Sequence, residues 1–110
     1  MAQGGRQGAR RLLLQALYQK QIADHELSEL SRQFHDQPAY QRVDQEFFDE
    51  QLNAICGQQQ ALQASIDEFI DRPLEQLDPV ELGILLIGTY ELESRIDIPF
   101  KVVINDCVNL

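Results

Sequence analysis

The chain has few of the features that mark metal-binding, disulfide-rich or membrane proteins. It holds only two cysteines, Cys56 and Cys107, which are far apart and lie in no CxxC motif. This spacing favours buried thiols in a reducing cytoplasm over a disulfide or a metal site. No apolar run approaches the roughly 20 residues of a membrane-spanning helix, and no secretory signal follows the N-terminus. We therefore expect a cytoplasmic protein with no metal and no membrane contact.

The residue patterns of common enzymes are absent as well. No histidine, serine or cysteine is arranged as a nucleophile–base pair, and no glycine-rich phosphate loop occurs. His25 and His35 lie among polar residues, which favours solvated surface positions over metal ligation. The sequence therefore predicts neither catalysis nor a cofactor.

Helical periodicity is what the sequence does contain. With 110 residues, 44% of them apolar, the chain is long enough for one domain with a small core. Apolar residues recur at helical spacing, and no segment alternates as a strand would, so we predict one all-α domain over residues 1–110 with about five to seven helical segments. Residues 1–8 are expected to be mobile. The expected helices cover residues 8–22, residues 27–34, a long run after Asp44 that Gly57 divides, residues 79–93 and residues 99–110.

The clearest helix start lies at Asp78. This residue offers an N-cap acceptor, a proline occupies the first helical position, and Glu81 stands where it completes a capping box. The helix that follows is apolar on most sides, which is typical of a helix at the centre of a fold. The alternative is that it presents a second face to a partner, and Leu82 and Leu86 would then contribute to that face.

Charge is distributed unevenly along the chain. Residues 1–23 hold four basic and no acidic residues, whereas residues 24–110 hold five basic and eighteen acidic residues; the two parts carry +4 and −13, and the whole carries −9. Such asymmetry indicates a contact with nucleic acid or a membrane. Arg6, Arg10 and Arg11 lie at the start of the first expected helix, where the helix dipole disfavours cations. They form either a phosphate-binding arm or a solvated basic start that the fold tolerates.

The apolar face of the last expected helix continues to Leu110 without a C-cap signal. This pattern suggests a domain whose closing helix is missing, which would leave the apolar faces of residues 79–93 and 99–110 uncovered. Exposed apolar patches promote association, so we expect the chain to form homo-oligomers.

Several short motifs complete the sequence pattern. Behind the arginine-rich start lies Gln15-Ala16-Leu17-Tyr18. The others are Arg72-Pro73-Leu74, Leu77-Asp78-Pro79-Val80-Glu81, Ile87-Gly88, Tyr90-Glu91-Leu92, Pro99, Lys101-Val102 and Ile104-Asn105. Together these motifs resemble the NusB family of transcription antitermination proteins. The resemblance covers essentially the whole chain, with residues 24–70 matching by pattern rather than by motif.

The resemblance implies two small helical bundles packed across each other, with the last helix of the family missing here. It also implies that the chain binds the boxA element of nascent RNA together with NusE, a ribosomal protein. In the family, this complex belongs to the RNA polymerase antitermination complex on bacterial ribosomal RNA operons. By position in the family, Arg6, Arg10, Arg11 and Lys101 would contact RNA phosphates. Phe69 would stack on a base, unless it is a core residue.

The resemblance also places Tyr18, Glu75 and Glu81 toward the NusE-binding surface, where the acids would meet basic residues of the ribosomal protein. Glu81 has a second role open to it, the capping of its own helix. Leu82 and Leu86 replace the polar or basic residues that are common at these positions. Two other interpretations stay open. One is the RNA-binding domain fused to some ribosomal RNA cytosine methyltransferases, which resembles NusB, and the other is a helical adaptor that binds only protein.

Overall fold

The structure is a computed structural model that describes residues 2–110, with the side chains of residues 5–99 and 101–110. Every regular element in this part of the chain is helical, and it contains no strand, so the predicted all-α fold is confirmed. The helices are α1 (Ala2–Ala23), α2 (Leu27–His35), α3 (Gln45–Gly57), α4 (Gln59–Asp67), α5 (Pro79–Ser94) and α6 (Phe100–Val108), with short 3-10 helices η1 (Pro38–Arg42) and η2 (Leu74–Gln76).

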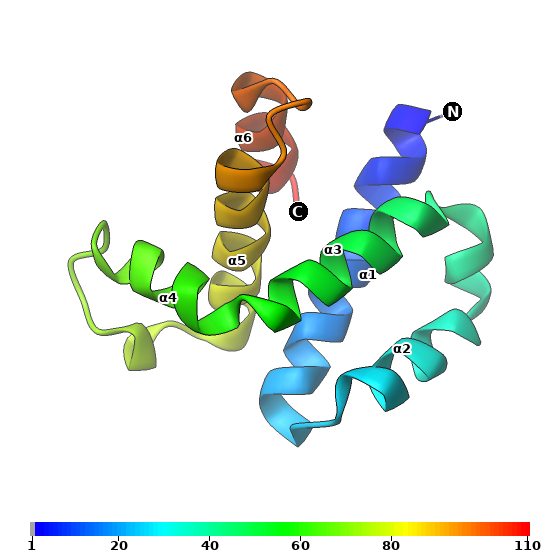
Figure 1. Ribbon diagram of the computed structural model, residues 1–110, viewed down its shortest axis with the longest axis horizontal. Coiled ribbons are helices and arrows are strands. Elements are labelled where there is room, and N and C mark those ends of the chain that lie inside the picture. The colour runs from blue at the N-terminus through cyan, green and yellow to red at the C-terminus, as the bar shows by residue number, and fades with distance from the viewer. Residues whose placement is uncertain (1) are drawn as a thin grey trace.

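The helices form two groups that meet along α1 and α5 (Figure 1). α1 packs along α3, and α2 contacts both of them to complete the first group. α4 and α6 pack against α5 and make the second group, in which α5 is the central helix. This arrangement confirms the expected pair of small helical groups packed across each other.

Two aspartates begin helices as the sequence predicted. Asp78 Oδ1 accepts a hydrogen bond from Glu81 N at 2.8 Å, and Glu81 Oε1 accepts one from Asp78 N at 3.2 Å, which completes the capping box of α5. Asp44 Oδ1 accepts a hydrogen bond from Phe47 N at 3.1 Å and so caps α3. Gly57 divides the long apolar run into α3 and α4, also as predicted.

The start of α1 differs from the prediction of a mobile segment over residues 1–8. The helix already includes residues 2–8, while Met1 lies outside the described residues. A Cβ atom on Gly5 would lie 3.2 Å from Asp44 N, and one on Gly8 would lie 3.0 Å from Val43 Cγ1. The glycines therefore let the helix pack closely against the chain that leads into α3. Asp44 N also donates a hydrogen bond to Gly5 O at 3.0 Å, which fixes the two segments together.

α5 occupies the central place that its composition predicted. Leu86 and Ile87 are fully buried in the core. A Cβ atom on Gly83 would lie 2.6 Å from Leu14 Cδ1 of α1, so a larger residue at this position requires Leu14 to move. The close approach of α1 and α5 thus depends on glycine, which has no side chain, at position 83.

Candidate RNA and partner interfaces

Arg6 and Arg11 are the accessible arginines of α1. The Arg6 side chain is 37% exposed, and Arg11 is exposed further along the helix. Arg6 Nε lies 3.7 Å from Asp44 Oδ2, and the Arg6 guanidinium carbon lies 5.0 Å from the centre of the Phe47 ring. Both arginines are therefore open to an anionic ligand, although Arg6 is held against α3.

Arg10 has a different position from its two neighbours. Its side chain is only 1% exposed, and its Nε and Nη2 donate hydrogen bonds to the two carboxylate oxygens of Glu91 at 2.8 and 2.7 Å. Nη1 donates to Asp106 Oδ2 at 2.7 Å and to Gln7 Oε1 at 3.1 Å. This network corrects the expectation that Arg10 reaches RNA phosphates, because all three guanidinium nitrogens are occupied inside the protein.

The same network sets the ionisation of its members. Burial lowers the pKa of Arg10, but the hydrogen bond and charge of Glu91, with the charge of Asp106, raise that pKa above its ordinary value. Cys107 lies beside them, and burial together with the charge of Glu91 raises the pKa of its thiol to about 11. Arg10 is therefore a permanent internal cation, and Cys107 is a buried protonated thiol at neutral pH.

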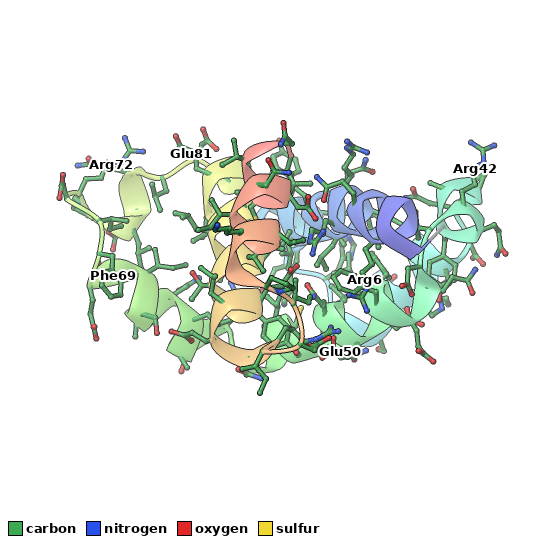
Figure 2. All side chains as sticks on the ribbon, turned by 90° about the horizontal axis from the view of Figure 1, so that it is seen from above. Arg6, Arg42, Glu50, Phe69, Arg72 and Glu81 are labelled. Atoms are coloured by element: carbon green, nitrogen blue, oxygen red, sulfur yellow. The ribbon has the colours of Figure 1, made fainter. Side chains whose placement is uncertain are left out.

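Phe69 and Lys101 are both exposed. Phe69 follows α4 and has 84% of its surface open to solvent, which excludes the alternative that it is a core residue. Lys101 lies in the first turn of α6. Figure 2 shows Phe69 beside Arg72 at one end of the molecule, whereas Arg6 lies on the other side of α5 and α6. The candidate RNA-binding residues are thus spread along the molecule instead of forming one patch.

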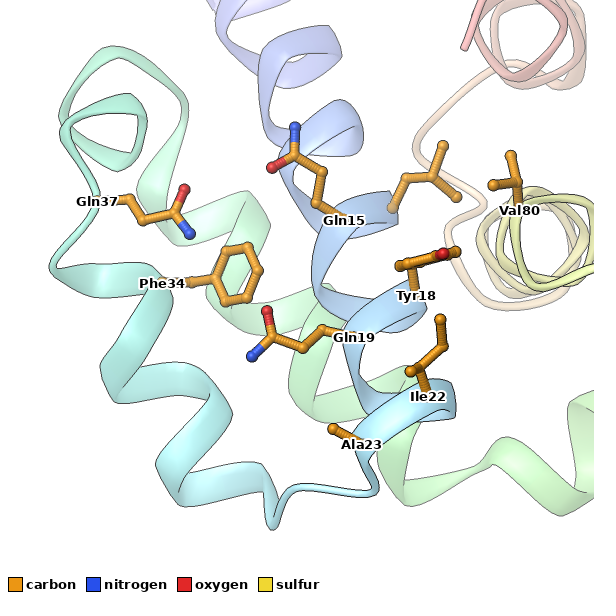
Figure 3. Close-up of a pocket in the computed structure, with 9 residues that line it drawn as sticks. Gln15, Tyr18, Gln19, Ile22, Ala23, Phe34, Gln37 and Val80 are labelled. Carbon is orange, nitrogen blue, oxygen red and sulfur yellow. The ribbon is translucent and has the colours of Figure 1, made fainter.

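Tyr18 belongs to an apolar groove between α1, α2 and the start of α5 (Figure 3). The groove has a volume of about 600 Å³, and Tyr18 is 42% exposed within it. Ile22 and Val80, for which no partner contact was predicted, are 59% and 44% exposed at its edge. Ile22 follows Tyr18 by one helical turn, and this spacing is the sequence signal that would have identified it.

The other partner-binding candidates divide into exposed and buried residues. Glu75 in η2 and Glu81 in the first turn of α5 are exposed. Glu81 caps its helix and also accepts a hydrogen bond from Arg72 Nη2 at 3.1 Å. Leu82 is half-buried, whereas Leu86 is fully buried in the core. Leu86 therefore cannot contribute to an exposed partner surface, and the expectation for it is corrected to a core role.

A second apolar groove lies between α5 and α6. It has a volume of about 270 Å³, and no charged residue lines it. Leu92 and Ile104, each 48% exposed, and Val108, 78% exposed, form part of its wall. Leu92 also lines an adjoining groove between α4 and α5. The exposed apolar surface on residues 79–93 and 99–110 that the sequence predicted is therefore present.

Neither a metal site nor a membrane helix occurs in the part of the chain that the structure describes. No group of three or more acidic, histidine or cysteine side chains is placed to hold a metal ion there. None of the helices described is both long enough and apolar enough to cross a membrane. The features that remain are an arginine-bearing helix start, an exposed aromatic residue and apolar grooves.

These features define a small all-helical protein with candidate binding surfaces. The model of the NusB family matches residues 7–110. The chain therefore belongs to the NusB family, and the resemblance drawn from its motifs is confirmed.

Its relatives carry the name transcription antitermination protein NusB. The protein from Idiomarina loihiensis is 36% identical over 110 residues, which cover 100% of this chain and 79% of the relative. The protein from Marinobacter nauticus is 38% identical over 107 residues, covering 97% of this chain and 68% of the relative. The protein from Cupriavidus pinatubonensis is 40% identical over 105 residues, covering 96% of this chain and 63% of the relative. These names describe a non-enzymatic factor, in agreement with the prediction that the chain is not an enzyme.

Proposed function

We propose that this chain is an RNA-binding antitermination factor of the bacterial cytoplasm. In this proposal it binds boxA RNA together with the ribosomal protein NusE and helps RNA polymerase to transcribe through ribosomal RNA operons. The observation that carries the proposal is the family match over residues 7–110, joined to the names of the relatives. The geometry adds which side chains are free to take part.

Arg6, Arg11 and Lys101 would bind RNA phosphates, and Phe69 would stack on a base. All four side chains are at least partly exposed, and single-stranded RNA is recognised by this combination of cations and aromatic rings. Three phosphate contacts predict a slope of log K against log salt near −2, from roughly −0.7 per contact on a single strand. Because the rest of the chain is acidic, binding should depend strongly on these few cations.

The test is fluorescence anisotropy with a labelled boxA RNA and a scrambled RNA of the same composition. Arg6→Ala, Arg11→Ala and Lys101→Ala should each weaken binding and make the salt slope shallower by about 0.7. Arg32→Ala is the matched control, because Arg32 is an arginine on α2 whose side chain is 67% exposed and is not among the proposed RNA contacts. Unchanged RNA affinity of a variant that carries all three substitutions, at Arg6, Arg11 and Lys101, would overturn the proposed RNA contact.

NusE would bind beside Tyr18, Glu75 and Glu81. The apolar groove at Tyr18 would accept apolar side chains, and the two exposed glutamates would meet basic residues of NusE. Tyr18→Ala should therefore weaken NusE binding in calorimetry without changing the affinity for boxA RNA measured with the chain alone. If NusE binds but boxA and scrambled RNA are bound equally weakly, a protein-only adaptor replaces this proposal.

A further inference from the structure

Arg6 faces a carboxylate before any RNA arrives. Its Nε is buried without a hydrogen-bond partner and lies 3.7 Å from Asp44 Oδ2, beyond hydrogen-bond distance. The guanidinium lies over the Phe47 ring, which holds it in place through a cation–π contact. The surrounding hollow, of about 280 Å³, is lined by Arg6, Asp44, Glu46, Phe47, Glu50 and Arg95.

The second arginine of this hollow is already fully paired. Arg95 donates hydrogen bonds to both carboxylate oxygens of Asp97 at 3.0 and 3.1 Å and to Glu50 Oε1 at 2.9 Å. Glu50 also accepts a hydrogen bond from the Tyr90 hydroxyl. Glu46 also lines the hollow, and the charge of Arg6 also acts on Asp97, but Asp44 is the described carboxylate that forms an ion pair with Arg6.

The position of Asp44 does not depend on Arg6. Asp44 N donates to Gly5 O at 3.0 Å, and Asp44 Oδ1 accepts from Phe47 N at 3.1 Å as the cap of α3. Because Gly5 has no side chain, the backbone at Asp44 can approach α1 closely. One carboxylate oxygen is thus used for folding, and the other is left facing the arginine.

We infer that Asp44 limits the affinity of this chain for RNA by competing with phosphate for Arg6, an inference that rests on the proposed function. The pair is partly exposed, with side chains 37% and 25% open to solvent, so the ion pair is weak and a phosphate can displace it. A phosphate that binds Arg6 must also tolerate the charge of Asp44 nearby. Arg6 therefore contributes fully only to an RNA that is held by other contacts as well.

The test replaces the charge of Asp44 and keeps its shape. Asp44→Asn retains a side-chain oxygen that caps α3, so the fold should persist, and an unchanged melting temperature checks this. Asparagine is uncharged and forms no ion pair with Arg6. The Kd for the labelled boxA RNA should therefore fall about two- to five-fold, which corresponds to the free energy of an exposed ion pair. Asp44→Ser, which also caps a helix, should give the same result and serves if the asparagine variant is unstable.

A matched control separates this effect from a general change in net charge. Glu26→Gln removes the same charge just beyond the far end of α1, whose stretch from Arg6 to Ala23 spans roughly 25 Å at 1.5 Å per residue, and should leave the Kd unchanged. In an Arg6→Ala background, Asp44→Asn should no longer tighten binding, because the competition has been removed.

Each outcome of this cycle has a definite meaning. If Asp44→Asn tightens binding equally with and without Arg6, or not at all, the competition between Asp44 and phosphate is ruled out. If Arg6→Ala, Arg11→Ala and Lys101→Ala all leave RNA binding unchanged, the proposed RNA contact fails first. A loss of affinity in those variants without any effect of Asp44→Asn would reject only the present inference.

Discussion

Arg10 shows at the scale of single residues how burial decides what a charged side chain does. It lies on the same helix as Arg6 and Arg11, yet its guanidinium joins α1 to Glu91 of α5 and Asp106 of α6. A buried charge without its partner is strongly destabilising, whereas exposed ion pairs contribute little. Arg10 therefore serves the fold, and its neighbours remain available to a ligand.

We expect Arg10→Ala to lower the free energy of unfolding by about 3–5 kcal/mol, because Glu91 would keep a buried charge without its partner. Arg11→Ala, at an exposed position of the same helix, should change the free energy of unfolding by no more than about 0.5 kcal/mol. Urea denaturation followed by circular dichroism measures both values. Equal stability of the two variants would contradict the structural role of Arg10.

Sequence reasoning could not separate Arg10 from the other two arginines. Its partners Glu91 and Asp106 lie 81 and 96 residues further along the chain, and only the packing of α5 and α6 brings them together. Phe69 is a similar case, because its exposure depends on where α4 ends and not on its own residue type. The residue types suggested binding, but tertiary structure decided which residues are accessible.

At the scale of elements, the helix starts that could be predicted are those with local causes. Asp44 and Asp78 make their capping hydrogen bonds to residues three positions ahead, so the short motif contains the whole interaction. The start of α1 has no such motif. Its helix is supported by contact with Val43 and Asp44, which Gly5 and Gly8 permit, and a glycine-rich segment read alone predicts mobility instead.

The two glycines of α5 should respond differently to alanine. A Cβ on Gly88 would make an ordinary contact of 3.4 Å with Cys107 Sγ, and no described glycine has a positive φ, so Gly88→Ala should stabilise the fold by about 0.5–1 kcal/mol. Gly83→Ala should gain less, because its Cβ would displace Leu14. Chemical denaturation measures the free energy of unfolding of both variants.

The displaced Leu14 also lines the groove at Tyr18, so Gly83→Ala should weaken partner binding there while Gly88→Ala should not. A larger stabilisation from Gly83→Ala than from Gly88→Ala would contradict the tight contact between α1 and α5.

At the scale of the whole molecule, net charge and apolar surface act in opposite directions. The charge of −9 favours separate molecules in solution, whereas the grooves beside α5 expose apolar side chains that favour contact. Salt screens the repulsion but leaves apolar attraction in place. The association state should therefore depend on ionic strength.

We expect the chain to self-associate at high concentration, and more strongly as salt is raised, because the groove between α5 and α6 is open and uncharged. Leu92→Gln, which alters two adjoining grooves, should reduce the association. Ile96→Gln is the control, because Ile96 is 93% exposed but lines neither groove. Sedimentation velocity across a concentration series measures both, and a monomer at every concentration would refute the expectation.

The network around Arg10 also has a consequence for the order in which the chain can fold during synthesis. Arg10 is made early, but Glu91 and Asp106 follow only 81 and 96 residues later. Until they emerge, the Arg10 guanidinium has no internal counterion and stays hydrated, so α1 cannot take its final packed position. The helices α1, α5 and α6 should therefore reach their final packing only after Asp106 has emerged from the ribosome.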